Sequence, residues 1–416
     1  MIRRGMFLSV TDAATRGATV FAALLIARFF GPAEYGQYSA ASAVCGLAVL
    51  ITSVGFEEEF TRRASLDAGL LWRGLRLNLQ SILITGLLMF LGLAVVSATG
   101  VYAPQTTTYI YLLGVTLFLG RLQMPFRHYM LVLGKPELSA FIQASGTALI
   151  VVATATLIFL KQSVAAIVVA GIAINALILV AWWRLLPVVP VSADKSTGTL
   201  RDFVWRALPF GLSSIAWAAY FNIGSIMLSV TRSDAEVGIY GATFRIIGLS
   251  YTIAYAMTNA YTPPLFAAFQ SGTAEYGQLA RRLLGILLVL GLAVDGGLLL
   301  FARPIIQLVL GSEYVTSGVP VAQCLAVAAM VRFLNFGFSE ILTTAKLQPW
   351  RVGSEVALLV TNIAVTWLLI PRFGALGAAA GCLVAELVLM LCSVILILKM
   401  CPRVLQLSGT AVTTGS

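Results

Sequence analysis

Phe30 to Ser42 reads FGPAEYGQYSAAS, and a weakened copy of it, RSDAEVGIYGATF, runs from Arg232 to Phe244. Both copies follow a long apolar stretch, and both place Ala-Glu-x-Gly-x-Tyr at the start of the next one. The offset between the copies is 202 residues, close to half of the 416-residue chain. A second pair of similar turns, around Pro136 and Pro349, has an offset of 213 residues. The sequence therefore predicts two related halves.

The composition is typical of a membrane protein. Charged residues make up 11% of the chain and hydrophobic ones 59%, whereas soluble domains have about 25% charged and about 45–50% apolar residues. These charges are too few to cover a soluble surface, which excludes an ordinary soluble enzyme, and the chain is too apolar to be disordered. The net charge of +10 is better explained by contact with a membrane surface than by nucleic acid.

Twelve stretches are apolar and long enough to cross a bilayer core, which needs about 20 residues per helix. The predicted spans are 6–29, 36–55, 75–98, 107–131, 139–159, 163–184, 203–230, 236–262, 280–302, 318–344, 352–370 and 375–398. The loops between them are too short for a soluble domain. We therefore predict an all-α polytopic membrane protein with about 12 transmembrane helices.

The distribution of Lys and Arg sets the expected orientation. The side that holds both termini has 18 basic residues outside the spans, and the opposite side has five. By the positive-inside rule, both termini are expected in the cytoplasm.

Six spans separate equivalent elements of the two halves, and an even number preserves their orientation in the membrane. The halves are therefore expected to be parallel repeats, that is, two six-helix bundles related by a pseudo-twofold axis around a central cleft. The predicted division is an N-terminal lobe (1–184), a cytoplasmic linker (185–202), a C-terminal lobe (203–398) and a cytoplasmic tail (399–416).

Charges within the spans are the candidate functional residues, since a charge at a helix centre costs roughly 2.5–3.5 kcal/mol on insertion scales. Arg121 and Arg332 lie in the fourth and tenth spans, 211 residues apart, so we expect them to face each other across the cleft. His128 follows Arg121 and Asn335 follows Arg332 on the same helix faces. Guanidinium groups suit a pyrophosphate because they donate two parallel hydrogen bonds. The competing interpretation of Arg332 is a structural ion pair, for instance with Glu340.

For the remaining intramembrane charges, two interpretations stay open: contact with the substrate, or pairing with another side chain of the protein. Asp12 and Arg16 lie one helical turn apart in the first span and can neutralise each other. Arg245 has no carboxylate three or four residues away, so it needs another helix or the substrate. Asp295 and Glu386 are candidate proton or sodium sites, or partners of an arginine.

The sequence points to no bound cofactor. With a single histidine, His128, and five scattered cysteines, no Cys/His metal site can be assembled. There is no phosphate-binding glycine loop, so ATP hydrolysis is not expected.

Several turn motifs together resemble the polysaccharide transporter family, whose members are lipid-linked oligosaccharide flippases of the multidrug/oligosaccharidyl-lipid/polysaccharide superfamily (O-antigen flippases, Wzx-like). The motifs are ARFFGPAEYGQY (Ala27 to Tyr38), RRA (Arg62 to Ala64), LPFGL (Leu208 to Leu212), VGIY (Val237 to Tyr240) and PPL (Pro263 to Leu265). The resemblance covers nearly the whole chain. Because these motifs are turn signatures, the resemblance supports an inference about the fold more strongly than one about the substrate.

The resemblance implies a V-shaped fold that moves undecaprenyl-pyrophosphate-linked oligosaccharide repeat units to the outer leaflet of the cytoplasmic membrane, for surface polysaccharides such as O-antigen or exopolysaccharide. The implied partners are the lipid-linked substrate, membrane lipids and other polysaccharide assembly membrane proteins, with no nucleic acid. In this interpretation Arg121, Arg332, Arg245, Arg16, His128 and Asn335 form the substrate cleft, and Asp12, Asp295 and Glu386 are candidates for ion coupling.

Two other function classes remain open at this point. One is a proton- or sodium-coupled antiporter of drugs or small cations on the related fold, which would favour carboxylates and aromatic residues over facing arginines. The other is a membrane enzyme that polymerises or transfers glycans. Such an enzyme usually needs a sizeable external loop, which this chain lacks, so we expect a transporter rather than an enzyme.

Overall fold

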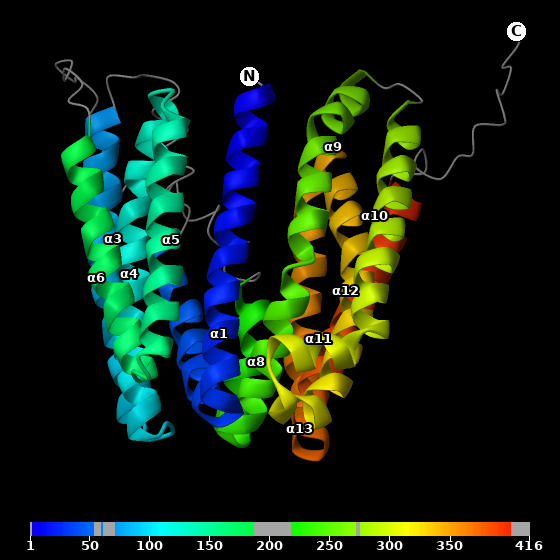
Figure 1. The fold of residues 1–416 in the computed structure, drawn as a ribbon. Helices are drawn as coiled ribbons and strands as arrows, with labels where there is room; N and C mark the ends of the chain where they lie inside the picture. Colours follow the sequence, from blue (N-terminus) through cyan, green and yellow to red (C-terminus); the bar gives the residue numbers. More distant parts are fainter. Residues whose placement is uncertain (1, 54–59, 61–70, 187–217, 272–274, 401–416) are drawn as a thin grey trace, which may run out of the picture. The chain divides into compact units, whose positions relative to one another are not determined.

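The computed structural model describes residues 2–53, 60, 71–186, 218–271 and 275–400, and these residues form helices and short connections with no strand among them. The helices of the first half are α1 (Ile2–Ala48), η1 (Val49–Ser53), α3 (Leu71–Ala98), α4 (Pro104–Val132), α5 (Pro136–Phe159) and α6 (Val164–Leu185). After a helix at Ala218–Thr231 come α8 (Asp234–Gly248), α9 (Tyr251–Ser271), α10 (Glu275–Leu300), α11 (Ala302–Val309), η3 (Ser312–Tyr314), α12 (Val315–Thr344) and α13 (Gln348–Met400) (Figure 1).

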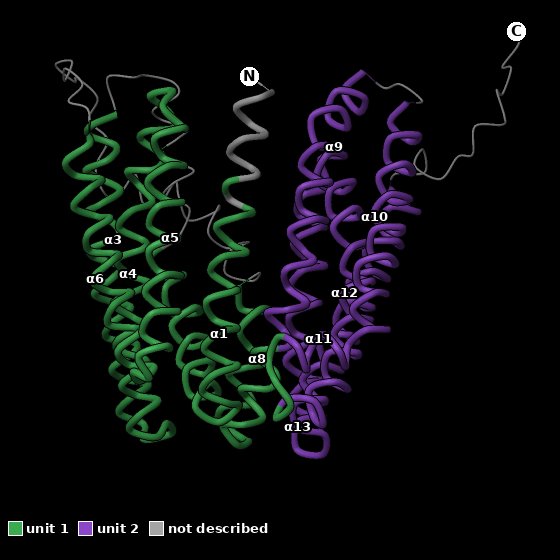
Figure 2. Tube along the Cα trace, in the orientation of Figure 1, with its two compact units in different colours: residues 1–242, 309–313 green, residues 243–308, 314–416 purple. Residues whose placement is uncertain are grey.

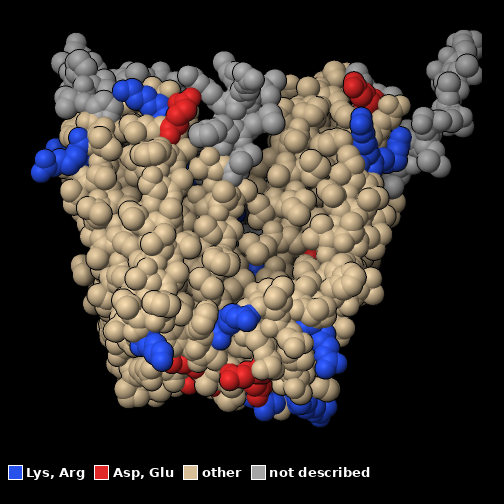
Figure 3. Space-filling view, in the orientation of Figure 1, with Lys and Arg blue, Asp and Glu red and all other residues tan. Residues whose placement is uncertain are grey.

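Within the described residues, eight helical segments are long and apolar enough to cross a membrane. In the space-filling view, the visible charged residues gather towards the helix ends, and the faces between them are almost uncharged (Figure 3). These features confirm the prediction of an all-α polytopic membrane protein. The number of twelve spans stays a prediction.

Two of the long helices change direction at a glycine and so each hold two predicted spans. Gly31 in α1 has φ 74° and ψ 174° and precedes Pro32, which fixes its own φ and cannot donate a helical hydrogen bond. Gly374 in α13 has φ 54° and ψ −131°. A positive φ is strained for residues with a Cβ atom, so glycine is the residue that permits these reversals.

The described structure divides into two compact units (Figure 2). Unit 1 comprises residues 1–242 and 309–313, and unit 2 comprises residues 243–308 and 314–416. Almost all of the predicted linker, 185–202, lies outside the described residues, and the predicted lobe boundaries stay a prediction.

The two copies of the repeated motif pack directly on each other in unit 1. A Cβ atom on Gly36 would lie 1.7 Å from the backbone oxygen of Asp234, and a Cβ atom on Gly238 would lie 2.0 Å from the backbone oxygen of Pro32. Gln37 donates a hydrogen bond to the Asp234 carboxylate at 2.9 Å. The repeat found in the sequence is therefore a reciprocal crossing of α1 and α8, in which each glycine admits the backbone of the other copy.

In each unit, one helix contacts several of the others. In unit 1, α4 contacts α1, α3, α5 and α6, and in unit 2, α12 contacts α9, α10 and α13. The α4 helix is not among the eight apolar segments. Arg121 and His128 are half-buried on this helix.

Candidate functional site

The densest polar network among the described residues joins α12 to α13 inside unit 2. Arg332 donates hydrogen bonds from one guanidinium nitrogen to both carboxylate oxygens of Glu386, at 3.2 and 3.4 Å. Asn335 donates from its amide nitrogen to the Glu386 carboxylate at 2.8 Å and to the Glu386 backbone oxygen at 2.9 Å. Glu386 is 0% exposed and Arg332 5%. A buried ion pair of this kind is stable only when further hydrogen bonds satisfy its polar atoms, and Asn335 supplies one of them to the carboxylate.

Aromatic residues enclose the arginine end of this network. The Arg332 guanidinium carbon lies 5.0 Å from the centre of the Phe336 ring, within cation–π distance. Phe336 meets Tyr251 of α9 edge to face, with ring centres 6.2 Å apart. Tyr251 is close enough to Arg332, Glu386 and Asp295 to interact with them electrostatically. Helices α9, α10, α12 and α13 thus contribute to one buried polar region.

Asp295 of α10 is the unbalanced charge of this region. It is 0% exposed, and neither of its carboxylate oxygens has a hydrogen-bond partner within the described residues. The nearby Ser250 hydroxyl donates to the backbone oxygen of Ile247 at 2.8 Å. Because Arg332 and Glu386 already neutralise each other, an ionised Asp295 would add one uncompensated negative charge. A bound proton or a monovalent cation would remove it.

The other candidate residues lie apart from this network. Arg121 and His128 are both half-buried on α4 in unit 1, seven residues apart and so on one helix face. Arg16 is exposed on α1, and Arg245 is half-buried on α8 in unit 2. The Asp12 side chain lies outside the described residues. Because Arg121 and Arg332 belong to different units, the expectation that they face each other stays a prediction.

Arg332 forms an ion pair, as in the competing interpretation of this residue, and the carboxylate in that pair is Glu386. The suggested partner, Glu340, lies on the same helix as Arg332, whereas Glu386 comes from the neighbouring helix 54 residues later in the chain. Both Glu386 and Asn335 were candidates, but the sequence could not show that they meet.

Two further buried or half-buried polar features were not anticipated. Gln123 of α4 donates to the Asn175 side-chain oxygen on α6 at 3.0 Å. Asn78 of α3 is 0% exposed, and its amide atoms have no hydrogen-bond partner in the part of the chain described. The available signal for both was an uncharged polar residue within an apolar span.

No group of three or more His, Cys, Asp or Glu residues that could hold a metal ion occurs among the described residues.

Comparison with solved structures identifies the fold. An inward-facing multidrug resistance MATE family transporter of the MOP superfamily matches with a TM-score of 0.74 and 15% identity, over 93% of this chain and 94% of that one. The lipid II flippase MurJ, in an inward closed conformation, matches with a TM-score of 0.74 and 12% identity, over 96% and 90%. The eukaryotic MATE transporter AtDTX14 has a TM-score of 0.63 and 13% identity, over 95% and 96%. At these identities the likeness shows the fold, which is that of a two-lobed membrane transporter.

The sequence itself identifies the family. A family model described as "Polysaccharide biosynthesis protein" matches residues 25–318, most of the chain, so the chain belongs to that family. This confirms the resemblance drawn from the turn motifs. The comparison with curated protein sequences gives no match.

Proposed function

We propose that the protein is a flippase that moves undecaprenyl-pyrophosphate-linked oligosaccharide repeat units from the cytoplasmic to the outer leaflet of the cytoplasmic membrane by alternating access. The observation that carries this proposal is the polysaccharide biosynthesis family match over residues 25–318. The fold shared with a lipid II flippase supports it. The basic residues outside the spans support an orientation with both termini in the cytoplasm.

In this proposal Arg332 exchanges one anionic partner for another. In the described conformation its guanidinium is bound to Glu386, so it meets a pyrophosphate only after that pair opens. A pyrophosphate is a better acceptor because it offers several oxygens to the same planar fork. Asn335 would hold Glu386 during the exchange. Arg121 and His128 on α4 would form the matching site in the first half, and Arg245 and Arg16 would contact the pyrophosphate or glycan.

Asp295 is the proposed coupling residue. It is fully buried and has no hydrogen-bond partner among the described residues, so its neutral form is the one that an apolar surrounding favours. Release of a proton would place a negative charge beside the Arg332–Glu386 pair and weaken the hold of Glu386 on the arginine. Binding of Na⁺ at the same carboxylate, and coupling through Glu386 or Asp12, are the alternative forms of this step.

The test is a flip assay in proteoliposomes with a labelled lipid-linked oligosaccharide. We expect Arg332→Ala and Arg121→Ala to lose at least tenfold in initial rate, and Arg332→Lys to remain impaired because lysine lacks the bidentate fork. Arg351→Ala is the matched control, since Arg351 forms a more exposed ion pair with Glu355 at 3.0 Å. Normal rates in both alanine variants, with unchanged protein amounts, would remove the pyrophosphate assignment.

A drug or small-cation antiporter is the second candidate function, favoured by the likeness to MATE transporters. Its signature would be efflux of a cationic dye against a proton or sodium gradient. Dye efflux combined with no movement of lipid-linked oligosaccharide would favour the antiporter over the flippase.

A further inference from the structure

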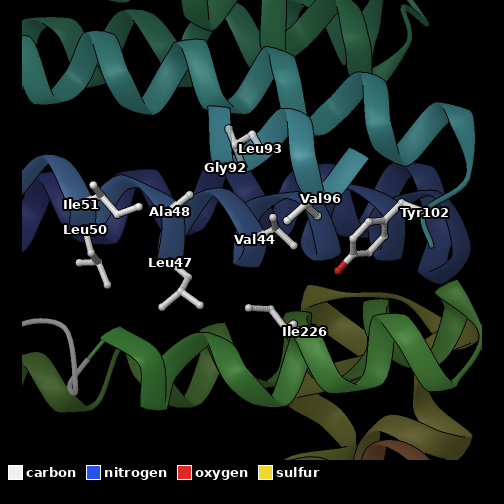
Figure 4. Close-up of a pocket in the computed structure, with 10 residues that line it drawn as sticks. All are labelled: Val44, Leu47, Ala48, Leu50, Ile51, Gly92, Leu93, Val96, Tyr102 and Ile226. Carbon is white, nitrogen blue, oxygen red and sulfur yellow. The ribbon is translucent and has the colours of Figure 1, made fainter. Parts of the chain in front are cut away.

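Unit 1 contains an apolar cavity away from every charged candidate residue. Its volume is about 450 Å³, and Figure 4 shows it between the end of α1, α3 and the helix Ala218–Thr231. The lining residues are Val44, Leu47, Ala48, Leu50, Ile51, Gly92, Leu93, Val96, Tyr102 and Ile226. Tyr102 is the one polar side chain in this lining, and its hydroxyl is hydrogen-bonded to Ser229 at 3.3 Å. The walls thus offer hydrocarbon contacts and no unused polar group.

The cavity has room for part of a lipid chain. A water molecule takes up about 30 Å³ of liquid, and a carbon group of a lipid chain is of similar size, so roughly 10 to 15 carbon atoms fit. A Cβ atom added to Gly92 would meet nothing within 4 Å. The glycine therefore leaves this wall open.

We infer that this cavity holds a segment of the polyprenyl chain of the lipid carrier, an inference that rests on the proposed function. Lipid is as apolar as the cavity wall, so the hydrophobic effect gives little preference for either place. What an occupant adds is dispersion contact, which the lining atoms lose when the space is empty. Dispersion depends on shape, and branched Val, Leu and Ile walls contributed by three separate segments suit a methyl-branched chain better than a straight acyl chain.

The cavity would therefore contribute selectivity. A flippase for one carrier lipid must recognise it among a large excess of phospholipids. Pyrophosphate contacts on charged residues distinguish the headgroup, and the cavity would distinguish the chain.

Glycine substitution provides the test, because a Cβ atom added at Gly92 meets no other atom within 4 Å. Gly92→Leu places a side chain in the cavity. Gly171→Leu is the matched control, since Gly171 lies in an apolar helix of the same unit and also has nothing within 4 Å of an added Cβ atom. Ile226→Trp fills the cavity from the opposite wall and serves as a second variant.

The readout is lipid retention by the purified full-length protein in native mass spectrometry, with undecaprenyl phosphate and phosphatidylglycerol offered separately. We expect Gly92→Leu and Ile226→Trp to retain about tenfold less undecaprenyl phosphate than wild type and Gly171→Leu, with phosphatidylglycerol unchanged. Equal retention of undecaprenyl phosphate in all four proteins would overturn the inference, and so would a loss of phosphatidylglycerol at the same positions.

This binding measurement needs no transport, so the two proposals fail separately. If wild type retains undecaprenyl phosphate in a Gly92-dependent way but flips no lipid-linked oligosaccharide, the cavity assignment stands and the proposed function fails. If wild type flips the substrate and Gly92→Leu changes neither flipping nor retention, the proposed function stands and the cavity assignment fails.

Discussion

The crossing of the two repeated motifs gives a sharp prediction for Gly36 and Gly238. A Cβ atom on Gly36 would lie 1.7 Å from the Asp234 backbone oxygen, and contacts below 3.0 Å are essentially never seen. In Gly36→Ala, the new Cβ atom and the Asp234 oxygen must therefore move apart by at least 1.3 Å (3.0 minus 1.7). For Gly238, whose added Cβ atom would lie 2.0 Å from the Pro32 oxygen, the displacement is at least 1.0 Å (3.0 minus 2.0).

Overpacking typically costs about 1–3 kcal/mol and occasionally more. The upper end applies here because the obstructing atoms are backbone oxygens, which cannot move away by changing a rotamer. We therefore expect each single alanine variant to lose about 3 kcal/mol of stability. The double variant should lose less than the sum of the two, because a Cβ atom on Gly238 also lies 3.0 Å from the Gly36 nitrogen and one separation of the helices relieves both clashes.

The assay is thermal unfolding in detergent, followed as the fraction of monodisperse protein that survives heating. Gly17→Ala in α1 is the control, since its added Cβ atom would meet nothing within 4 Å and alanine is a better helix former than glycine by about 1 kcal/mol. The apparent Tm should fall by several degrees for the crossing variants and stay level or rise for the control. Crossing variants as stable as Gly17→Ala would refute the reasoning.

Three further outcomes follow from the buried contacts of unit 2. Glu386→Gln leaves the Arg332 guanidinium buried without its carboxylate and should lower the free energy of unfolding by about 3–5 kcal/mol. The Arg332→Met/Glu386→Gln double variant should recover most of this loss, and the same thermal assay measures both. Asp295→Asn should fold normally yet abolish gradient-driven transport while exchange without a gradient persists. Transport that still follows the gradient in that variant would exclude Asp295 from coupling. Gly381→Ala, whose Cβ atom would lie 2.1 Å from the Thr366 hydroxyl oxygen, should lower stability by about 1–3 kcal/mol, whereas an unchanged Tm would contradict this packing.

The fold was largely predictable because a bilayer demands long apolar helices and turns between them. Gly31 and Gly374, where two helices reverse, both fall between predicted spans. The polar pairings were less accessible. Which carboxylate meets Arg332 depends on the rotation of α13 against α12, and helical periodicity fixes only the face on which a residue lies. Glu340 and Glu386 were therefore equally suitable partners in sequence terms.

The motifs that mark the family and the residues proposed for transport are distinct sets, and the structure explains why. Tyr35 and Val237, which occupy the same place in the two copies, are both 0% exposed, and Gly36 and Gly238 each face backbone of the opposite copy. The close approach of the two backbones constrains the glycine position whatever the protein carries, and both copies have glycine there.

The central helices are free of that constraint, and there the halves have diverged. Helix α4 carries Arg121 and His128, whereas α12 carries Arg332 and Asn335 bound to Glu386. A symmetric pair of sites would serve a symmetric ligand. A lipid-linked glycan has a chain, a pyrophosphate and a sugar in a row, so unequal halves are what its recognition requires. We therefore expect exchanging the polar residues of α4 and α12 to abolish transport of the lipid-linked glycan in the proteoliposome flip assay, and normal transport by the exchanged protein would contradict this account.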